Sequence, residues 1–135
     1  MTAESVVADT HSLLWWIGGS DRLSGSAGEA LESAAAIFVS SISFWEIGML
    51  QAKGRIALDR PIARWVNDIV ASGEVIDAPV TAPIGATASA LVDLPGDPAD
   101  RLIAATALSF GVPIVTKDER LRRWAAESGR IDVVW

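Results

Sequence analysis

The 135-residue sequence contains no cysteine and only one histidine, His11. Without cysteine, disulfide frameworks, thiolate zinc sites, iron–sulfur clusters and cysteine nucleophiles are excluded. A Ser-His-Asp relay would have to use His11, and the Gly-x-Ser-x-Gly turn that presents such a serine is missing. Gly-x-Gly-x-x-Gly and Walker patterns are also missing, so dinucleotide and nucleoside triphosphate sites are unsupported. We expect His11 to be a structural or substrate-contact residue.

Long apolar runs and an excess of basic residues are lacking as well. No apolar run reaches the roughly 20 residues of a membrane span, and the first residues, with Glu4 and no basic stretch, do not resemble a signal peptide. We therefore expect a cytoplasmic protein without membrane contact. The 11 basic and 17 acidic residues give a net charge of -6, which argues against a general nucleic-acid coat. Half of the residues are hydrophobic, and the length predicts one domain spanning residues 1–135.

Short apolar runs alternate with helical patterns along the chain. The runs predict strands at residues 5–8, 36–39, 75–76, 113–116 and 131–134. The patterns between them predict helices at residues 10–17, 24–34, 41–53, 59–73, 81–92, 97–111 and 118–127, with Asp59 capping the fourth. This alternation indicates an α/β fold, with a central, mostly parallel twisted sheet of about four to five strands and helices on both faces. In such sheets, ligands bind beyond the carboxyl ends of the strands.

Acidic side chains occur where the expected strands end. Asp9 directly follows the first strand, and Asp118 follows the fourth after one lysine, so both should lie at the same rim. Either could instead be a helix N-cap. Glu46 lies inside an expected helix, where its neighbours on the same face are Ile42, Ser43, Met49 and Leu50, and all of these except Ser43 are apolar. A glutamate on a face that a helix should bury needs a paired cation, a hydrogen-bond donor or a metal ion.

Asp97 and Asp100 stand at the start of the expected helix 97–111. Asp97 suits the N-cap position, and Asp100 would lie near the positive end of the helix dipole. If four carboxylates meet at about 5 Å, each pair repels by roughly 3 kcal/mol at an effective dielectric constant near 20. Such a cluster requires divalent cations or bound protons. Oxygen ligands favour Mg²⁺ or Mn²⁺ over Zn²⁺. Such an ion generates hydroxide from water and stabilises charge on phosphate oxygens, so the chemistry that suits the cluster is phosphoryl transfer to water.

Four segments, in order, closely resemble the motifs of PIN-domain ribonucleases, and in particular those of VapC-type toxins of bacterial toxin–antitoxin pairs. The segments are residues 9–16 (DTHSLLWW), 41–47 (SISFWEI), 97–104 (DPADRLIA) and 115–118 (VTKD). The resemblance implies a single PIN-like nuclease domain and endonucleolytic cleavage of RNA. It also implies an Mg²⁺ or Mn²⁺ site with an acidic quartet carried by Asp9, Glu46, Asp100 and Asp118.

The same resemblance implies supporting residues and partners. Asp97 would be an auxiliary ligand or only a cap, Glu119 a substitute ligand, and the hydroxyls of Thr116, Ser43 and Thr10 would support the carboxylates. Toxins of this type form homodimers and are inhibited by an antitoxin whose C-terminal segment lies in a groove near the site. Candidate lining residues, most of which could equally be core, are Trp15, Trp16, Phe44, Trp45, Met49 and Leu50.

Nine of the 11 basic residues fall in two segments, residues 53–64 and 117–130. These are either solvated helix faces or a local strip that binds RNA phosphates, for which the candidates are Arg122, Arg123, Lys117, Lys53 and Arg55. Two other functions stay open. One is a carboxylate/Mg²⁺ phosphatase or receiver-like domain in which Asp9 takes the phosphoryl group, with Lys117 in support. The other is a non-catalytic interaction module on the same fold.

Overall fold

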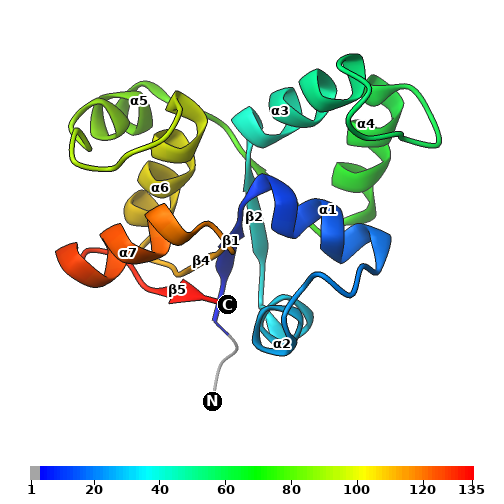
Figure 1. The fold of residues 1–135 in the computed structure, drawn as a ribbon. Coiled ribbons are helices and arrows are strands. Elements are labelled where there is room, and N and C mark those ends of the chain that lie inside the picture. The colour runs from blue at the N-terminus through cyan, green and yellow to red at the C-terminus, as the bar shows by residue number, and fades with distance from the viewer. Residues whose placement is uncertain (1–3) are drawn as a thin grey trace.

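The computed structural model describes residues 4–135, which form five strands and seven helices, with one or two helices between successive strands (Figure 1). The strands are β1 (Val6–Ala8), β2 (Ile37–Ser40), β3 (Ile76–Ala78), β4 (Ile114–Val115) and β5 (Val133–Val134). The helices are α1 (Thr10–Gly18), α2 (Gly25–Ser33), α3 (Ser41–Ala52), α4 (Ile62–Ser72), α5 (Ala82–Ser89), α6 (Pro98–Phe110) and α7 (Glu119–Ser128).

All five strands pair in parallel in the order β3-β2-β1-β4-β5, which confirms the predicted fold class. In the central strand, Val7 pairs with Phe38 of β2 on one side and with Ile114 of β4 on the other. From β1 the chain first builds the sheet toward β3 and later toward β5. Because the helices that follow β1 and β4 leave in different directions, a crevice forms at the carboxyl ends of these two strands.

The core lies in two layers, one on each face of the sheet. Alternate residues of β1 contribute to each layer: Val7 packs with α5, α6 and α7, whereas Val6 and Ala8 pack with the helices on the other face. Ile114 and Val115 of β4 divide in the same way. Figure 1 shows the resulting layers, with α5, α6 and α7 on one side and α1, α2, α3 and α4 on the other. Burial on both faces explains why the strands are continuous apolar runs.

Aspartate side chains cap the amino-terminal ends of three helices. Asp9 Oδ1 accepts a hydrogen bond from the Ser12 N–H at 2.9 Å, and Asp97 Oδ1 accepts one from the Asp100 N–H at 3.2 Å. Asp118 Oδ1 accepts bonds from two N–H groups in the first turn of α7, at 2.8 and 3.2 Å. The capping alternative is therefore correct for all three residues, and each still has a second carboxylate oxygen.

Two predicted boundaries were wrong. Asp59 does not cap α4, which begins after Pro61 without a side-chain cap; its carboxylate is instead paired with the neighbouring Arg60 at 2.7 Å. The helix predicted at residues 81–92 ends at Ser89. The next residues leave the helix as turns that bury Leu91 and Leu94 against α6, because these large side chains complete the core there.

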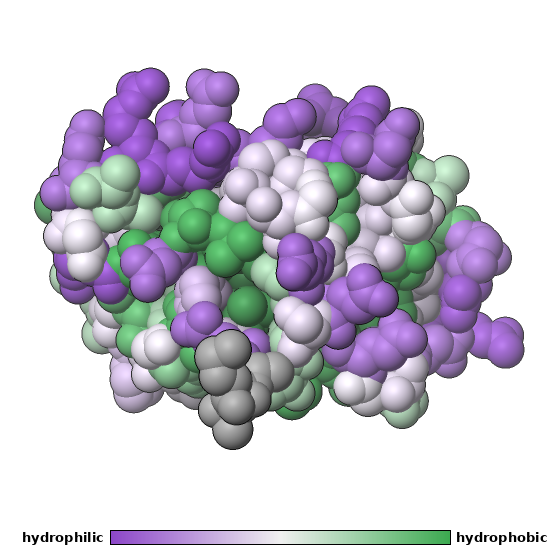
Figure 2. All heavy atoms as spheres, turned by 90° about the horizontal axis from the view of Figure 1, so that it is seen from below, coloured by the Kyte–Doolittle hydropathy of each residue, from purple (hydrophilic) through white to green (hydrophobic). Residues whose placement is uncertain are grey.

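The amino ends of the strands lie at the bottom of Figure 1, and Figure 2 shows that face. Hydrophilic side chains gather along its margins, with apolar side chains toward its centre. The carboxyl ends of the strands point to the opposite rim. Among the helices of residues 4–135, none combines the length and the apolar character needed to cross a membrane.

Candidate functional site

Four separate segments carry the predicted quartet to one cleft of about 560 Å³ at the carboxyl ends of the strands. Asp9 directly follows β1, and Asp118 caps α7 just after β4. Glu46 projects from α3, and Asp100 from the first turn of α6. Asp97 and Glu119, the two further acidic candidates, line the same cleft. The structure thus brings together quartet carboxylates that are up to 109 residues apart in sequence.

Thr116, fully buried at the end of β4, connects two of these carboxylates. Its hydroxyl donates a hydrogen bond to Asp9 Oδ2 and accepts one from the Asp118 N–H at 3.1 Å. Asp9 Oδ1 is held by its helix cap, so both of its oxygens have a fixed position. Each carboxylate oxygen has two lone pairs, so capping and orientation leave acceptor capacity facing the cleft.

Glu46 is held by a second pair of buried hydroxyls. The Thr10 hydroxyl lies 2.6 Å from Glu46 Oε1 and 3.0 Å from the Ser43 hydroxyl. Because Thr10 has one proton to give, it donates to the glutamate while Ser43 donates to Thr10. Burial raises the pKa of Glu46, and the charges of Asp97 and Asp9 raise it further, whereas the hydrogen bond from Thr10 lowers it.

The position of Glu46 on α3 differs in part from the prediction. The glutamate is half-buried and lies at the border of the buried face, since Met49, one turn later, is 37% exposed. The buried face itself is formed by Ser43, Phe44 and Ile47. The carboxylate therefore reaches the cleft and is not enclosed in the core.

Asp100 has the strongest electrostatic perturbation in the cleft. Burial, followed by the charges of Asp97, Asp118 and Glu46, raises its pKa to about 7. Arg120 opposes this effect only weakly: its Nη2 lies 3.9 Å from Asp100 Oδ2 and 3.6 Å from Asp118 Oδ2, and its side chain is 57% exposed. The protein's own cations thus do not balance the negative charge of the cluster.

Gly96 is a site residue that the sequence interpretation missed. Its φ of +121° lies outside the range that residues with a side chain readily adopt. A Cβ atom here would lie 2.5 Å from Asp100 Oδ2, so a residue with a side chain would displace this carboxylate. The sequence signal was a glycine directly before the Asp97-Pro98 helix start, where a sharp change of direction precedes the cap.

The basic side chains at the cleft come only partly from the predicted set. Lys117 and Arg122 line it, as predicted, together with Arg22 and Arg120. Within the described residues, the lining does not include the other three candidates: Arg123 faces neighbouring hollows, and Lys53 and Arg55 follow the far end of α3. Arg22 was missed because it lies in a turn after α1 that only the tertiary fold brings to the rim.

Aromatic residues form one wall of the cleft. The exposed His11 ring packs on Trp15, with ring centroids 5.7 Å apart, and both line the cleft. On α3, the candidate groove residues divide clearly: Trp45 is 60% and Met49 37% exposed, whereas Phe44 is buried. Trp16 is half-buried and packs against the core, and Leu50 is also half-buried.

The donor set fits a hard divalent cation. Within residues 4–135, no three acidic or histidine side chains are already gathered as a complete metal cage. Mg²⁺ does not require one, because it keeps several water ligands and uses one or two carboxylates together with substrate phosphates. The available donors are carboxylate oxygens without sulfur, which favour Mg²⁺ or Mn²⁺ over Zn²⁺. The pKa of Asp100 is raised by burial and by the charges of neighbouring carboxylates, so a bound cation would favour its ionised form.

The sequence is similar to one protein family and to a named ribonuclease. The family described as PIN domain matches residues 6–127. The protein named Ribonuclease VapC22, from Mycobacterium tuberculosis, is 40% identical over 119 residues, covering 87% of this chain and 90% of that protein.

Solved structures share the fold at lower identity. VapBC2 from Rickettsia felis, bound to a DNA fragment from its promoter, has a TM-score of 0.66 at 17% identity over 96% of both chains. VapBC-1 from nontypeable Haemophilus influenzae has a TM-score of 0.65 at 14% identity, again over 96% of both. A toxin–antitoxin complex from Klebsiella pneumoniae has a TM-score of 0.63 at 17% identity, covering 87% of this chain and 89% of that one.

Proposed function

The chain belongs to the PIN-domain family, and from that premise we propose that it is a VapC-type toxin that cuts RNA with Mg²⁺ or Mn²⁺. The reaction is endonucleolytic hydrolysis of a phosphodiester bond. The observation that carries the proposal is the convergence of Asp9, Glu46, Asp100 and Asp118 on one cleft, with the pKa of Asp100 raised to about 7. A carboxylate cluster short of positive charge is suited to binding divalent cations.

Asp9, Glu46, Asp100 and Asp118 would hold the ion, with Asp97 as a candidate auxiliary ligand. When bound, the ion supplies positive charge for the phosphate oxygens and acidifies a water molecule. Thr116 and Thr10 hold Asp9 and Glu46 in fixed orientations, which removes the cost of ordering these carboxylates. Arg22, Lys117 and Arg122 offer positive charge to the RNA phosphates at the edges of the cleft.

Family membership argues against the receiver-like alternative, in which Asp9 accepts a phosphoryl group. Both oxygens of Asp9 also receive hydrogen bonds, from the Ser12 N–H and the Thr116 hydroxyl. These bonds stabilise the carboxylate as a fixed charge and make it a weaker nucleophile. They are better suited to metal ligation than to covalent catalysis.

The substitution Asp9→Asn tests the proposal while preserving the fold. Asparagine caps helices about as well as aspartate, so the bond from the Ser12 N–H should survive. We expect RNA cleavage with Mg²⁺ to fall at least about a hundredfold, and growth inhibition on induction to disappear. The matched control is Asp93→Asn, which removes the same charge at an exposed position outside the cleft. Cleavage by Asp9→Asn at the wild-type rate would overturn the site assignment.

We also propose an antitoxin as the partner, with α3 as part of its docking surface. The structural neighbours include VapBC and toxin–antitoxin complexes, and α3, the helix that carries Glu46, exposes Trp45 and Met49. If a small reading frame lies next to this gene, co-expression with its product tests this. We expect the wild type to capture this protein and Trp45→Ala to lose the capture. Equal capture by both would place the docking surface elsewhere. A homodimer is the expected state of the free toxin and is checked by light scattering.

A further inference from the structure

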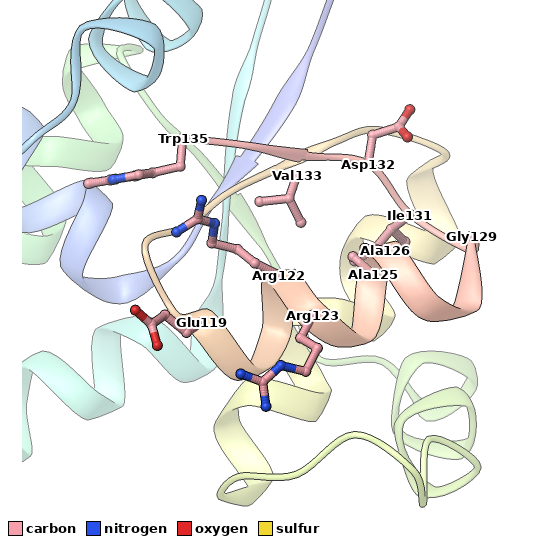
Figure 3. A pocket seen from close by; sticks show the side chains of 10 residues that line it. All are labelled: Glu119, Arg122, Arg123, Ala125, Ala126, Gly129, Ile131, Asp132, Val133 and Trp135. Carbon is pink, nitrogen blue, oxygen red and sulfur yellow. The ribbon is translucent and has the colours of Figure 1, made fainter.

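A second hollow, of about 690 Å³, lies beside the cleft between α7 and β5. We call it the α7–β5 groove; Figure 3 shows the residues that line it. They include three charged side chains of α7, Glu119, Arg122 and Arg123, and the aromatic ring of Trp135. None of these residues belongs to the carboxylate quartet.

Two contacts join the α7–β5 groove to the cleft. Glu119 and Arg122 line both hollows. On the other wall, Trp135 packs against Trp15 with ring centroids 5.8 Å apart, and Trp15 lines the cleft. The Lys117 ammonium lies 5.9 Å from the Trp15 ring centroid. A continuous strip of indole rings and cations therefore runs from the carboxylates into the groove.

The side chains of the groove differ in direction. In Figure 3, Arg122 extends toward Trp135, whereas the adjacent Arg123 extends to the opposite side of α7. The Asp132 carboxylate points away from Arg122, so it does not repel an anion placed there. Glu119 lines both the groove and the cleft, and in Figure 3 its carboxylate is apart from Trp135. The Trp135 end of the groove is thus its cationic and aromatic end.

We propose that the α7–β5 groove binds a nucleotide of the RNA strand next to the one whose phosphodiester is cut. The base lies against Trp135 and Trp15, and a phosphate lies at Arg122 with Lys117 nearby. Indole rings that stack on bases, beside cations that follow the backbone, are the chemistry by which single strands are bound. A base paired in a duplex has both faces stacked on its neighbours, so the groove selects unpaired RNA. This inference rests on the proposed ribonuclease function.

The test measures binding of RNA without cleavage. Wild type and variants are titrated by fluorescence anisotropy with a mixed-sequence single-stranded RNA of about 12 nucleotides, within the range of single-strand sites. The same RNA annealed to its complement is titrated in parallel. Ca²⁺ replaces Mg²⁺ to suppress hydrolysis. The variants are Arg122→Ala, Trp135→Leu, which retains an apolar side chain, and the matched control Arg123→Ala. Thermal melting followed by circular dichroism checks that each variant is folded.

We expect wild type to bind the single strand at least about tenfold more tightly than the duplex. Arg122→Ala and Trp135→Leu should each weaken single-strand binding about tenfold, and Arg123→Ala less than about twofold. Arg122→Ala should also reduce the slope of log K against log salt by about one phosphate contact. Equal effects of Arg122→Ala and Arg123→Ala, or equal wild-type affinity for duplex and single strand, would overturn the proposal.

A cleavage assay separates this proposal from the one on which it rests. If wild type cleaves cellular RNA with Mg²⁺ but Arg122→Ala and Trp135→Leu bind RNA normally, the ribonuclease stands and the groove is not a nucleotide site. If wild type cleaves no RNA with either Mg²⁺ or Mn²⁺, the proposed function and the groove assignment both fail.

Discussion

Neutralising Asp100 should stabilise the metal-free protein at neutral and alkaline pH. The carboxyl has a pKa of about 7 in the fold, against 3.8 as its ordinary value. Well below pH 3.8 it is neutral in both the folded and the unfolded chain and contributes nothing. As pH rises toward 7, the unfolded chain ionises freely while the folded chain resists ionisation. Asp100 therefore lowers the free energy of unfolding progressively between about pH 4 and pH 7.

The magnitude follows from the pKa difference. A rise from 3.8 to about 7 corresponds to roughly 4 kcal/mol when the group is fully ionised. The side chain is 25% exposed and Arg120 lies nearby, so water and salt reduce this figure. We expect Asp100→Asn to be about 2 kcal/mol more stable than wild type at pH 8 and equally stable near about pH 3. Asparagine keeps the side-chain volume and leaves the backbone bond to Asp97 in place.

The assay is urea unfolding in EDTA, followed by tryptophan fluorescence at several pH values. The buried Trp65 and Trp124 should report the loss of the core. The exposed Asp93→Asn variant serves as the control and should show no pH-dependent gain. With saturating Mg²⁺ the order should reverse, because a bound cation stabilises wild type more than a variant that lacks one ligand. A stability difference in EDTA that is absent, or that does not change with pH, would refute this account of the cluster.

Three further substitutions test how the carboxylates are held. Thr116→Val removes the hydroxyl that joins Asp9 and Asp118; we expect about 1–2 kcal/mol lower stability and about 10–100-fold slower cleavage, measured by unfolding and by an Mg²⁺-dependent rate assay. Gly96→Ala places a Cβ against Asp100 and should lower stability by about 1–3 kcal/mol and raise the Mg²⁺ concentration for half-maximal cleavage. Its control, Gly85→Ala in α5, meets no atom within 4 Å and should stabilise the helix, so equal losses in both variants would contradict the role of Gly96. Arg120→Ala removes a cation beside Asp100 and Asp118 and should tighten Mg²⁺ binding up to about fivefold by calorimetry; weaker binding would show that Arg120 orients the carboxylates and does not compete with the ion.

The fold could be predicted closely because the apolar runs, the residues that bound them and the helix caps all indicate the same elements. Apolar runs such as residues 113–116 are bounded by proline and by a capping aspartate, so both the strand and the following helix are signalled. The boundary errors arose where tertiary contacts decide. Asp59 had the right type and spacing for a cap, but its carboxylate pairs with Arg60. The helix predicted to residue 92 ends early because Leu91 and Leu94 turn into the core.

The site was only partly accessible to sequence reasoning. Three of the four carboxylates follow a strand end or a helix start, both of which are local signals, whereas Glu46 lies in the middle of α3. Their environment is not local. The bond from Thr10 to Glu46 crosses 36 residues, and the place of Gly96 under Asp100 depends on how α6 packs. Sequence clustering of basic residues was a weaker guide still, because Lys53 and Arg55 are close in sequence to Glu46 but follow the far end of its helix.

The net charge of -6 is compatible with a role in RNA cleavage because dissolved ions screen electrostatic interactions over short distances. At physiological ionic strength the screening length is about 8 Å, so an approaching phosphate responds to the nearest side chains more than to the whole protein. Those nearest the cleft are of both signs: the quartet in the centre, with Lys117, Arg120, Arg122 and Arg22 around it. The acidic centre repels RNA unless its charge is neutralised. Divalent cations should therefore strengthen RNA binding as well as hydrolysis. Fluorescence anisotropy in EDTA and in Ca²⁺ measures how much the cation increases RNA affinity, without hydrolysis. This increase should be smaller in Asp9→Asn than in wild type. An equal increase would show that the cations act on the RNA and not at the carboxylates.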